Sequence, residues 1–367
     1  MNDMKFLTVL FRKKPKVQKI DLTRRFDLIA RVGQGSMSKV WRARDTMTGK
    51  IVALKVLDPE KTQRFESRFI GLNKPTEGEV SVPLRHQHIV HSFEHGISRD
   101  NEQYLVMEFI EGVGLSYLID MQNQLMQDNR LRFVIQVGQA LDYFHKKNWI
   151  HRDLCPRNVL VDQQHQIKLI DFGLAVPNTP DFQKPGNRTG TPSYMAPELI
   201  KRQKTDQRID VFSYASTCFE MYTSRLPWEA AESIELVMQH INTPPGDIRE
   251  HAPDIDEQIA EIIMQGLELR PQDRWPSVSH MLSQLRKAHL RLSGDDEFDP
   301  EFAEPVVDEA VLQRRSRVVY WQPEDDDDVD EYEDVGPVTD QDGYEDVDTV
   351  LANDDDEYEE VDTVLDE

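Results

Sequence analysis

The fold of this chain is decided by residues 151–173, which read His-Arg-Asp-Leu-Cys-Pro-Arg-Asn and, after two apolar runs, end in Asp-Phe-Gly. Asp153 and Asn158 stand five positions apart, a spacing at which both side chains can serve one site. A carboxylate can orient a hydroxyl group and accept its proton, while an amide oxygen can bind a hard cation. Asp171 closes the apolar run Ile167–Ile170, and a carboxylate at a strand end beside a glycine suits Mg²⁺. The stretch therefore predicts a single site.

Three features upstream complete the same site if they converge on it. Residues 33–40 read Gly-Gln-Gly-Ser-Met-Ser-Lys-Val between two predicted strands, and glycines at such a turn let backbone amides approach a phosphate. Lys55 ends the apolar strand segment Val-Ala-Leu-Lys, where an ammonium group needs a phosphate or a carboxylate partner. Glu77 is the carboxylate that we expect to meet it, with Glu79 as the alternative. Each feature alone is a weak signal.

Hydrophobic periodicity divides the body of the chain into a strand-rich and a helix-rich part. Between residues 26 and 106, apolar runs bounded by turn residues predict strands at Phe26–Val32, Lys39–Arg44, Lys50–Leu57 and Gln103–Glu108. The only plausible helix there is Arg64–Arg85, which its two glycines and two prolines weaken. Between residues 114 and 292, helical spacing of apolar residues predicts helices at Arg130–Lys147, Asp210–Tyr222, Glu232–Ile241, Asp256–Leu267 and Pro276–Leu290.

The net charge is concentrated at one end of the chain. The 367 residues are 38% hydrophobic and 30% charged, with a formal net charge of −24. Residues 295–367 contain 31 acidic and 3 basic residues, whereas residues 1–294 contain 36 acidic and 40 basic ones. We therefore expect a near-neutral globular body and an acidic, disordered tail. Nothing in this distribution favours nucleic acid as a ligand.

Several classes of protein are excluded by the composition. The longest apolar runs fall far short of the about 20 residues that a membrane helix needs, and no signal-peptide pattern opens the sequence. Cys155 and Cys218 are the only cysteines, too few for a disulfide framework or a zinc cluster. We therefore expect no transmembrane segment and a reducing, cytoplasmic setting.

Both ends of the chain have a distinctive pattern. Residues 1–25 are a basic leader, expected to be solvated, although binding to an acidic surface is left open. Its clustered cations are Arg12, Lys13, Lys14, Lys16 and Lys19. In the tail, Tyr-Glu-Asp-Val-Asp-Thr-Val-Leu at 344–351 recurs as Tyr-Glu-Glu-Val-Asp-Thr-Val-Leu at 358–365, with a weaker copy from Tyr332. The repeat is too short for a stacked solenoid and too charged for a packed core, so we interpret it as contact motifs on a disordered tail.

Taken together, these motifs resemble the eukaryotic-type (Hanks-type) serine/threonine protein kinases, especially their bacterial members. The resemblance covers about residues 26–290 and keeps the family's order. It also includes Gly190-Thr-Pro-Ser-Tyr194, Ala196-Pro-Glu198, Asp210 and Arg274. It implies an α+β, bilobal kinase fold with a β-rich N-lobe (26–107) and an α-helical C-lobe (108–292), followed by the acidic, disordered tail (293–367).

The resemblance implies a role for each catalytic motif. Asp153 would position and deprotonate the substrate hydroxyl. Lys55, held by Glu77, would contact the α- and β-phosphates of ATP. Asn158 and Asp171 would hold Mg²⁺, with Mn²⁺ as an alternative. Positioning and charge would then supply most of the catalysis.

Further nucleotide contacts are implied around these residues. Residues 32–40 would cover the phosphates, Met107 would be the gatekeeper, and residues 108–110 would form the adenine-binding hinge. The implied nucleotide-binding residues are Val32, Gly33, Gln34, Gly35, Ser36, Met37, Ser38, Lys39, Val40, Ala53, Lys55, Glu77, Met107, Glu108, Ile110 and Leu160. Away from the nucleotide, Glu198 and Arg274 would form a structural ion pair, and His151 and Phe172 would pack in the family's hydrophobic spine.

The catalytic loop departs from the family at one charged position. Cys155 stands two positions after Asp153, where serine/threonine kinases usually carry a lysine that meets the γ-phosphate. Arg157 is placed like the substituting arginine of many tyrosine kinases, and its guanidinium would supply the missing charge. The alternative is that Arg157 faces solvent and turnover is slow.

Other departures concern packing. Ser38 replaces the third glycine of the phosphate loop, and Ala215 and Phe212 replace a usual glycine and tryptophan of the central helix. Ser81 stands one turn after Glu77, where the spine usually has an apolar residue. We therefore expect this helix to need a partner or a phosphate to hold its active position.

The segment at 190–194 resembles the pattern of serine/threonine kinases rather than that of tyrosine kinases, and the resemblance implies that Thr191 would contact Asp153. Arg152 beside the catalytic aspartate suggests activation by a phosphate on the neighbouring loop. Thr189 is the first candidate for that phosphate and Thr179 the second.

We therefore expect a kinase that acts on protein substrates, phosphorylates itself and serves cytoplasmic signalling. Thr349 and Thr363, in identical Val-Asp-Thr-Val-Leu contexts, are candidate autophosphorylation sites for a phosphothreonine-binding partner. The alternative for the tail is a solubilising segment. The alternatives for the whole chain are a pseudokinase-like scaffold that binds partners through the tail, and a small-molecule phosphotransferase.

Overall fold

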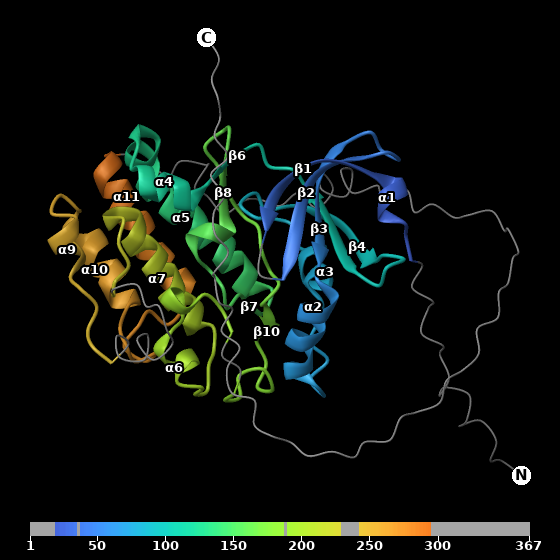
Figure 1. Ribbon diagram of the computed structural model, residues 1–367. Helices are drawn as coiled ribbons and strands as arrows, with labels where there is room; N and C mark the ends of the chain where they lie inside the picture. The colour runs from blue at the N-terminus through green and yellow to red at the C-terminus, as the bar shows by residue number, and fades with distance from the viewer. Residues whose placement is uncertain (1–18, 35–36, 187–188, 229–241, 295–367) are drawn as a thin grey trace, which may run out of the picture. The chain divides into compact units, whose positions relative to one another are not determined.

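A computed structural model describes residues 19–34, 37–186, 189–228 and 242–294. Within these ranges a β-sheet with short helices lies at one end, and a group of longer helices lies at the other (Figure 1). This arrangement confirms the α+β, two-lobed fold. The expected helix Glu232–Ile241, most of the basic leader and the tail from residue 295 lie outside the described residues, so what the sequence predicts for them stays a prediction.

The N-lobe is built on one antiparallel sheet with the strand order β1-β2-β3-β5-β4. Its strands are β1 (Phe26–Gln34), β2 (Ser38–Asp45), β3 (Ile51–Leu57), β4 (Ser92–Ile97) and β5 (Gln103–Glu108). Val40 pairs with Lys55, and Ala53 pairs with Met107. Because paired residues and residues two apart share a face of a sheet, these four side chains lie on the same face. The register thus gathers four implied nucleotide contacts.

The opposite face of this sheet has its own small core. Val52, Leu54 and Val106 pack there with Phe26, whereas Ala53 belongs to the large core shared with the C-lobe. The alternation of the two sets along β3 explains why this strand is apolar at every position except Lys55: both of its faces are buried.

The single expected helix Arg64–Arg85 is wrong, because the structure has two short helices there. These are α2 (Pro59–Glu66), extended by the 3₁₀ turn η1 (Ser67–Phe69), and α3 (Glu77–Ser81). Gly71 lies between them with φ +82°, a left-handed conformation that ends a helix. The side chains of Asp58 and Thr76 accept backbone hydrogen bonds at the starts of α2 and α3, so each helix has its own N-cap.

The end of the basic leader is ordered against the N-lobe. Asp21 caps the short helix α1 (Leu22–Arg25), which contacts β1. Arg25 forms ion pairs with Glu94 (2.6 Å) and Asp45 (3.3 Å). Residues 20–25 therefore belong structurally to the N-lobe sheet.

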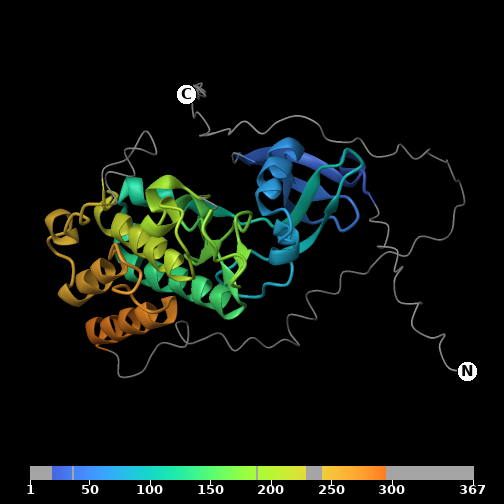
Figure 2. The same cartoon turned by 90° about the horizontal axis from the view of Figure 1, so that it is seen from below.

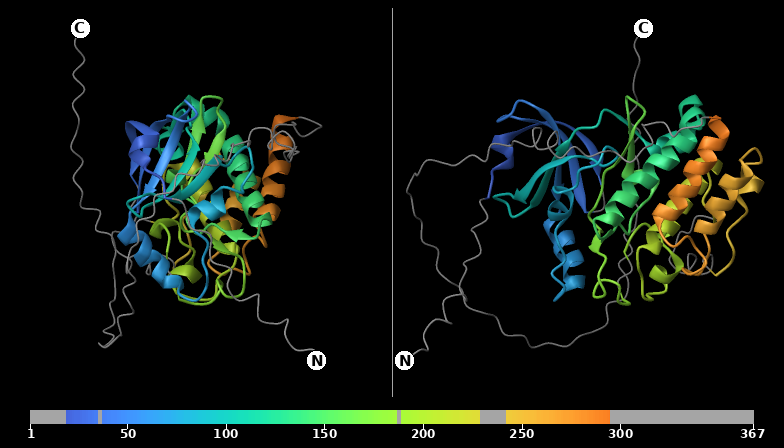
Figure 3. Two further views of the ribbon diagram at one scale, coloured as in Figure 1. Left: turned by 90° about the vertical axis from the view of Figure 1, so that its right-hand side faces the viewer. Right: turned by 180° about the vertical axis from the view of Figure 1, so that it is seen from behind.

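The C-lobe is a group of helices around the almost wholly buried α7. The helices are α4 (Leu115–Met121), α5 (Gln124–Lys146), α6 (Pro197–Ile200), α7 (Arg208–Thr223), α9 (Ile248–His251), α10 (Glu257–Gly266) and α11 (Val278–Ser293). Helices α5 and α11 run side by side (Figures 2 and 3), and α10 packs on α7. No helix within the described ranges is long and apolar enough to cross a membrane.

Short strands and turns carry the motifs between the sheet and the helices (Figure 1). A three-stranded sheet joins β6 (Gly112–Gly114), β8 (Val159–Asp162) and β9 (Ile167–Leu169), and a second pairing joins β7 (Trp149–Ile150) to β10 (Val176–Pro177). The 3₁₀ turn η2 (Pro156–Asn158) lies at the end of the catalytic loop, and the 3₁₀ turn η3 (Pro192–Tyr194) directly precedes α6. Residues 151–173 are thus fixed at both ends by strand pairing.

Candidate active site

Lys55, Glu77 and Asp171 meet at one point. The Lys55 Nζ atom donates to Glu77 Oε1 (2.8 Å) and to Asp171 Oδ2 (2.9 Å). Lys55 and Glu77 are each 5% exposed. Burial opposes the charge on Lys55, but the two carboxylates outweigh it and raise the lysine pKa. The ammonium group, carried by β3, is therefore charged, and it is fixed by carboxylates from α3 and from the end of β9.

The structure distinguishes Glu77 from the alternative Glu79. Glu79 forms a capping box with Thr76, in which each side chain accepts a hydrogen bond from the other residue's backbone N–H. The cap starts α3 at Glu77. Gly78 is required next, because a Cβ atom there would lie 2.2 Å from the ring of His95. The glycine that weakens the helix by propensity therefore permits its packing on β4.

The Asp153 carboxylate is held by two neighbours. Its Oδ1 atom accepts hydrogen bonds from the Thr191 backbone N–H (2.7 Å) and hydroxyl (2.8 Å). Asn158 Nδ2 donates to the Asp153 carbonyl oxygen (2.8 Å) and to Oδ2 (3.1 Å). The pKa of Asp153 is raised, chiefly by burial; the bonds from Thr191 lower it and the charge of Asp171 raises it further. A carboxylate so placed is suited to accept a proton.

The backbone before Asp153 is fixed by the fully buried Asp210 at the start of α7. Asp210 accepts hydrogen bonds from the backbone N–H groups of His151 (2.7 Å) and Arg152 (2.9 Å), and it contacts His145 Nε2 at 2.8 Å. Arg152 has φ +70°, a left-handed conformation that is unfavourable for a residue other than glycine. The bonds from Asp210 hold this turn and so determine where Asp153 lies.

Asn158 and Asp171 are adjacent oxygen donors. The Ile170 backbone N–H donates to the Asn158 carbonyl (3.0 Å), which places Asp171 beside Asn158. Because Nδ2 of Asn158 is directed to Asp153, its Oδ1 atom is the remaining side-chain donor for a cation. The described residues contain no group of three or more His, Cys, Asp or Glu suited to a metal. A pair of hard oxygen ligands fits Mg²⁺, which keeps waters and substrate phosphates in its shell.

Comparison with known proteins agrees with this geometry. The sequence matches the family described as "Protein kinase domain" over residues 26–285. The chain belongs to the protein kinase family. The family's motifs account for each of the side chains brought together above.

The relatives of this protein kinase include bacterial serine/threonine-protein kinases, which confirms the type of kinase that the sequence resembles. A probable serine/threonine-protein kinase of Clostridium acetobutylicum is 28% identical over 299 residues, covering 80% of this chain and 44% of the relative. A probable kinase PknB of Corynebacterium glutamicum is 29% identical (71% and 42%), and PrkC of Bacillus subtilis is 25% identical (72% and 40%). The chain thus spans less than half the length of each of these relatives.

The implied nucleotide-binding residues of the kinase surround the sheet face that carries Lys55. Ala53 and Met107 are buried on that face, and Val32 near the end of β1 is half exposed. In the segment for which the resemblance implies the hinge, the Glu108 backbone N–H donates to the His91 carbonyl, and the Glu108 carboxylate accepts from Lys168 Nζ (3.2 Å). Gly35 and Ser36 of the phosphate loop lie outside the described residues.

The hydrophobic spine of the kinase is formed by aromatic rings. Phe172 packs against His151, with ring centroids 5.5 Å apart, and both rings pack on Phe144 of α5. The sequence predicts Phe144 only as a position within the helix Arg130–Lys147. Ser81 is buried, and its hydroxyl donates to the Glu77 carbonyl (2.8 Å). The hydroxyl at the expected apolar position is thus satisfied within its own helix.

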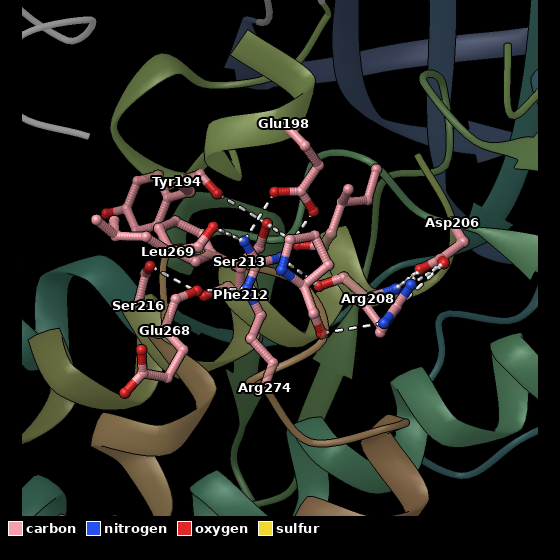
Figure 4. A network of polar contacts seen from close by, with 12 residues as sticks. Tyr194, Glu198, Asp206, Arg208, Phe212, Ser213, Ser216, Glu268, Leu269 and Arg274 are labelled. Atoms are coloured by element: carbon pink, nitrogen blue, oxygen red, sulfur yellow. Dashed lines mark hydrogen bonds and ion pairs between the residues drawn. The ribbon is translucent and has the colours of Figure 1, made fainter. Parts of the chain in front are cut away.

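Glu198 and Arg274 form the expected buried ion pair of the kinase C-lobe (Figure 4). Two parallel hydrogen bonds of 2.7 Å join the guanidinium to the carboxylate. The other three donors reach the carbonyl oxygens of Glu268, Leu269 and Arg208, so all five N–H groups are used. This pair ties α6, which follows Thr191 along the chain, to the helical core.

The kinase catalytic loop has its unusual pair at η2. Cys155 is buried with its Sγ atom 3.9 Å from Thr191 Oγ1, and burial raises the thiol pKa to about 11, so it is neutral at pH 7. Arg157 is exposed and forms no hydrogen bond with Asp153. Its charge acts instead on Cys155, Tyr194 and Glu220. The role that the resemblance implies for Arg157 at the γ-phosphate stays a prediction.

Two cations, the buried Arg152 and the partly buried Lys74, lie beside the segment that follows Asp-Phe-Gly. Arg152 is 4% exposed; Nη2 donates to the Phe182 carbonyl (3.0 Å), but Nε and Nη1 have no partner in the described part of the chain. Lys74 donates to the Gly173 carbonyl (3.3 Å). Burial lowers the pKa of Arg152 to about 10 and that of Lys74 to about 8. The sequence alone does not single out Lys74. The available signal is the aromatic pair before it, Phe65 and Phe69, whose rings its ammonium group contacts.

Proposed function

We propose that this chain is a serine/threonine protein kinase that transfers the γ-phosphate of ATP to protein hydroxyl groups. The observation that supports this most is the orientation of Asp153, which Thr191 and Asn158 hold while Lys55 is fixed between Glu77 and Asp171. A scaffold that has lost catalysis has no need of either arrangement. Homologues named as serine/threonine kinases support the same reaction.

Each side chain then has a defined task. Lys55 is a fixed positive charge for the ATP phosphates, and Asn158 and Asp171 are the oxygen donors for the metal. Bound Mg²⁺, or Mn²⁺ in its place, would neutralise phosphate charge. Asp153 receives the proton of the acceptor hydroxyl, and its raised pKa makes it a better proton acceptor.

The choice of a serine or threonine acceptor is supported by the Thr191 contact. The Thr191 hydroxyl and backbone N–H both engage Asp153 Oδ1, which leaves Oδ2 directed to Asn158 and open to a substrate hydroxyl. A small-molecule phosphotransferase is disfavoured because the chain has the Ala196-Pro-Glu198 segment together with the threonine segment at 190–194.

We propose that a phosphate on Thr189 activates the enzyme. The Thr189 hydroxyl is buried and has no partner among the described residues, and neither do two donors of Arg152. The neighbouring Gly190 lies so close to Arg152 that a Cβ atom there would be 2.6 Å from the Arg152 carbonyl oxygen. Two cations, Arg152 and Lys74, would compensate the phosphate charge and hold α3 in place despite Ser81. Thr179 is the second candidate for this modification.

The tail and the setting of the reaction complete the proposal. Thr349 and Thr363 would be autophosphorylated and read by a phosphothreonine-binding partner in cytoplasmic signalling. Phosphopeptide mapping after incubation with ATP tests this: unmodified tail threonines beside a phosphorylated Thr189 would contradict it.

The central experiment measures radiolabel transfer from ATP to the full chain and to casein and histone. Wild type should label protein, Asp153→Asn should lose at least about 100-fold in rate, and Cys155→Lys should match or exceed wild type. No transfer by wild type would favour the scaffold that binds partners through the tail. Equal transfer by Asp153→Asn would overturn the assignment of the base.

A further inference from the structure

Arg157 is an exposed cation beside the catalytic carboxylate. It lies in η2, immediately before Asn158, whose amide bonds to both the main chain and the side chain of Asp153. The loop thus folds back so that Arg157 stays close to Asp153. Within residues 19–34, 37–186, 189–228 and 242–294, no hydrogen bond or ion pair engages the Arg157 guanidinium.

Arg157 and Thr191 lie on the same side of Asp153. Its charge acts on Cys155, which contacts Thr191, and on Tyr194 of η3. The charge of Arg157 also acts on the carboxylate of Glu220, which accepts a hydrogen bond from the Tyr194 hydroxyl (2.5 Å). Among the described residues no ion pair joins Glu220 to Arg157, so the guanidinium keeps its donors for another anion.

The chain contains threonines in the matching chemical context. Thr349 and Thr363 each have acidic residues one, three and four positions before them: Asp348, Asp346 and Glu345, and Asp362, Glu360 and Glu359. An extended substrate rises about 3.3 Å per residue, so these carboxylates lie within roughly 13 Å of the acceptor hydroxyl. Because Asn158 of η2 bonds Asp153, the carboxylate assigned to that hydroxyl, carboxylates within this range can reach Arg157. By contrast, Thr339 is preceded by Val-Gly-Pro-Val and has no acidic residue at these positions.

We propose that Arg157 selects substrates with acidic residues on the N-terminal side of the acceptor threonine, and that the two tail repeats are substrates of this kind. The proposal rests on the kinase activity proposed above and adds its substrate class. The role of Arg157 is then recognition of the acceptor peptide rather than replacement of the lysine that Cys155 displaces. A solvent-exposed guanidinium binds a carboxylate with two parallel hydrogen bonds, which gives selectivity as well as affinity.

A charge-swap experiment with the full-length kinase tests this. The acceptors are three peptides that differ only before the threonine: Glu-Asp-Val-Asp-Thr-Val-Leu, Gln-Asn-Val-Asn-Thr-Val-Leu and Lys-Lys-Val-Lys-Thr-Val-Leu. The enzymes are wild type, Arg157→Glu, Arg157→Gln and the matched control Arg44→Glu, which makes the same charge change at an exposed position of β2. KM and kcat are measured separately for each pair.

Wild type should prefer the acidic peptide over the neutral one by at least about fivefold in kcat/KM, mainly through KM, and more weakly at high salt. Arg157→Glu should reverse the order of the acidic and basic peptides, Arg157→Gln should abolish it, and Arg44→Glu should keep the wild-type order. Equal kcat/KM for the three peptides with wild type would overturn the proposal. So would a loss of kcat that Arg157→Glu shows equally on all three, because that result assigns Arg157 to the transferred phosphate.

Two further measurements separate this inference from the activity itself. With full-length Asp153→Asn as the acceptor in trans, mass spectrometry should find phosphate on Thr349 and Thr363 well above Thr339, and comparable labelling of all three would count against selection by acidic residues. Fluorescence anisotropy of the acidic peptide with Asp153→Asn needs no turnover. If the acidic peptide binds and Arg157→Glu abolishes that binding, the recognition role is supported even if phosphate transfer fails. If phosphate is transferred without a preference for acidic peptides, the chain is still a kinase but the inference about Arg157 is wrong.

Discussion

Replacing Glu198 with glutamine tests how much the kinase domain depends on the buried pair with Arg274. The two side chains are 4% and 3% exposed, and the carboxylate accepts two hydrogen bonds of 2.7 Å. Glutamine keeps one acceptor oxygen but turns an NH₂ group toward a guanidinium N–H, and it leaves the buried positive charge without a counter-ion. Removing one partner of a buried pair costs about 3–5 kcal/mol, against a total stability of about 5–15 kcal/mol for a typical domain.

The assay is thermal unfolding of the full chain, with Asp206→Asn as the matched control in the same network. Asp206 pairs with Arg208 at 2.7 Å, but both side chains are at least one-third exposed, at 38% and 33%, so its loss should cost at most about 1 kcal/mol. We expect Glu198→Gln to lower Tm by about 10 °C and the control by a few degrees. The reasoning is refuted if the two variants unfold at the same temperature, because burial would then make no difference to the pair.

Three further outcomes are expected. Thr76→Ala removes the cap of α3 at a cost of about 1 kcal/mol, so hydrogen exchange at the Glu79 amide, which donates to the Thr76 hydroxyl, should speed up while the global Tm hardly changes; unaltered exchange would mean that the cap does not hold the helix. Thr191→Val removes one charge-assisted hydrogen bond to Asp153 and should lower kcat about 10- to 100-fold; a change under twofold would show that the backbone N–H suffices. Burial lowers the pKa of Lys74 to about 8 from the usual 10.5, so between these pH values the unfolded chain binds more protons and wild-type stability rises with pH. Lys74→Met removes this charge and should therefore be more stable than wild type in urea unfolding at pH 7, by a margin that shrinks toward pH 10. A margin that widens with pH would contradict the expectation.

The central part of the site is predictable because its residues lie in strands and loops of fixed spacing. Asp153 and Asn158 are close in sequence, so their shared site follows from local geometry. Lys55 is an ammonium group in an apolar strand, and such a group must find an anion wherever the chain folds. The motif order then places Asp171 beside it.

Other features depend on contacts that no local pattern contains. Glu77 and Glu79 are two residues apart, and only the capping box at Thr76 decides which one turns inward. The break before α3 follows from the left-handed Gly71, and the place of α3 on the sheet follows from the packing of His95 on Gly78, which joins distant parts of the sequence. A helical pattern broken by glycines therefore predicts weakness but gives no boundary.

The brevity of α3 has a consequence for compounds that act on this kinase. A helix of five residues, started by one cap and seated against the ring of His95, is too short to swing outward as a rigid lever. An inhibitor that displaces Glu77 must also unseat the β4 side chain and open the capping box. Compounds designed for an outward position of this helix should therefore bind this kinase more weakly than compounds that leave α3 in place.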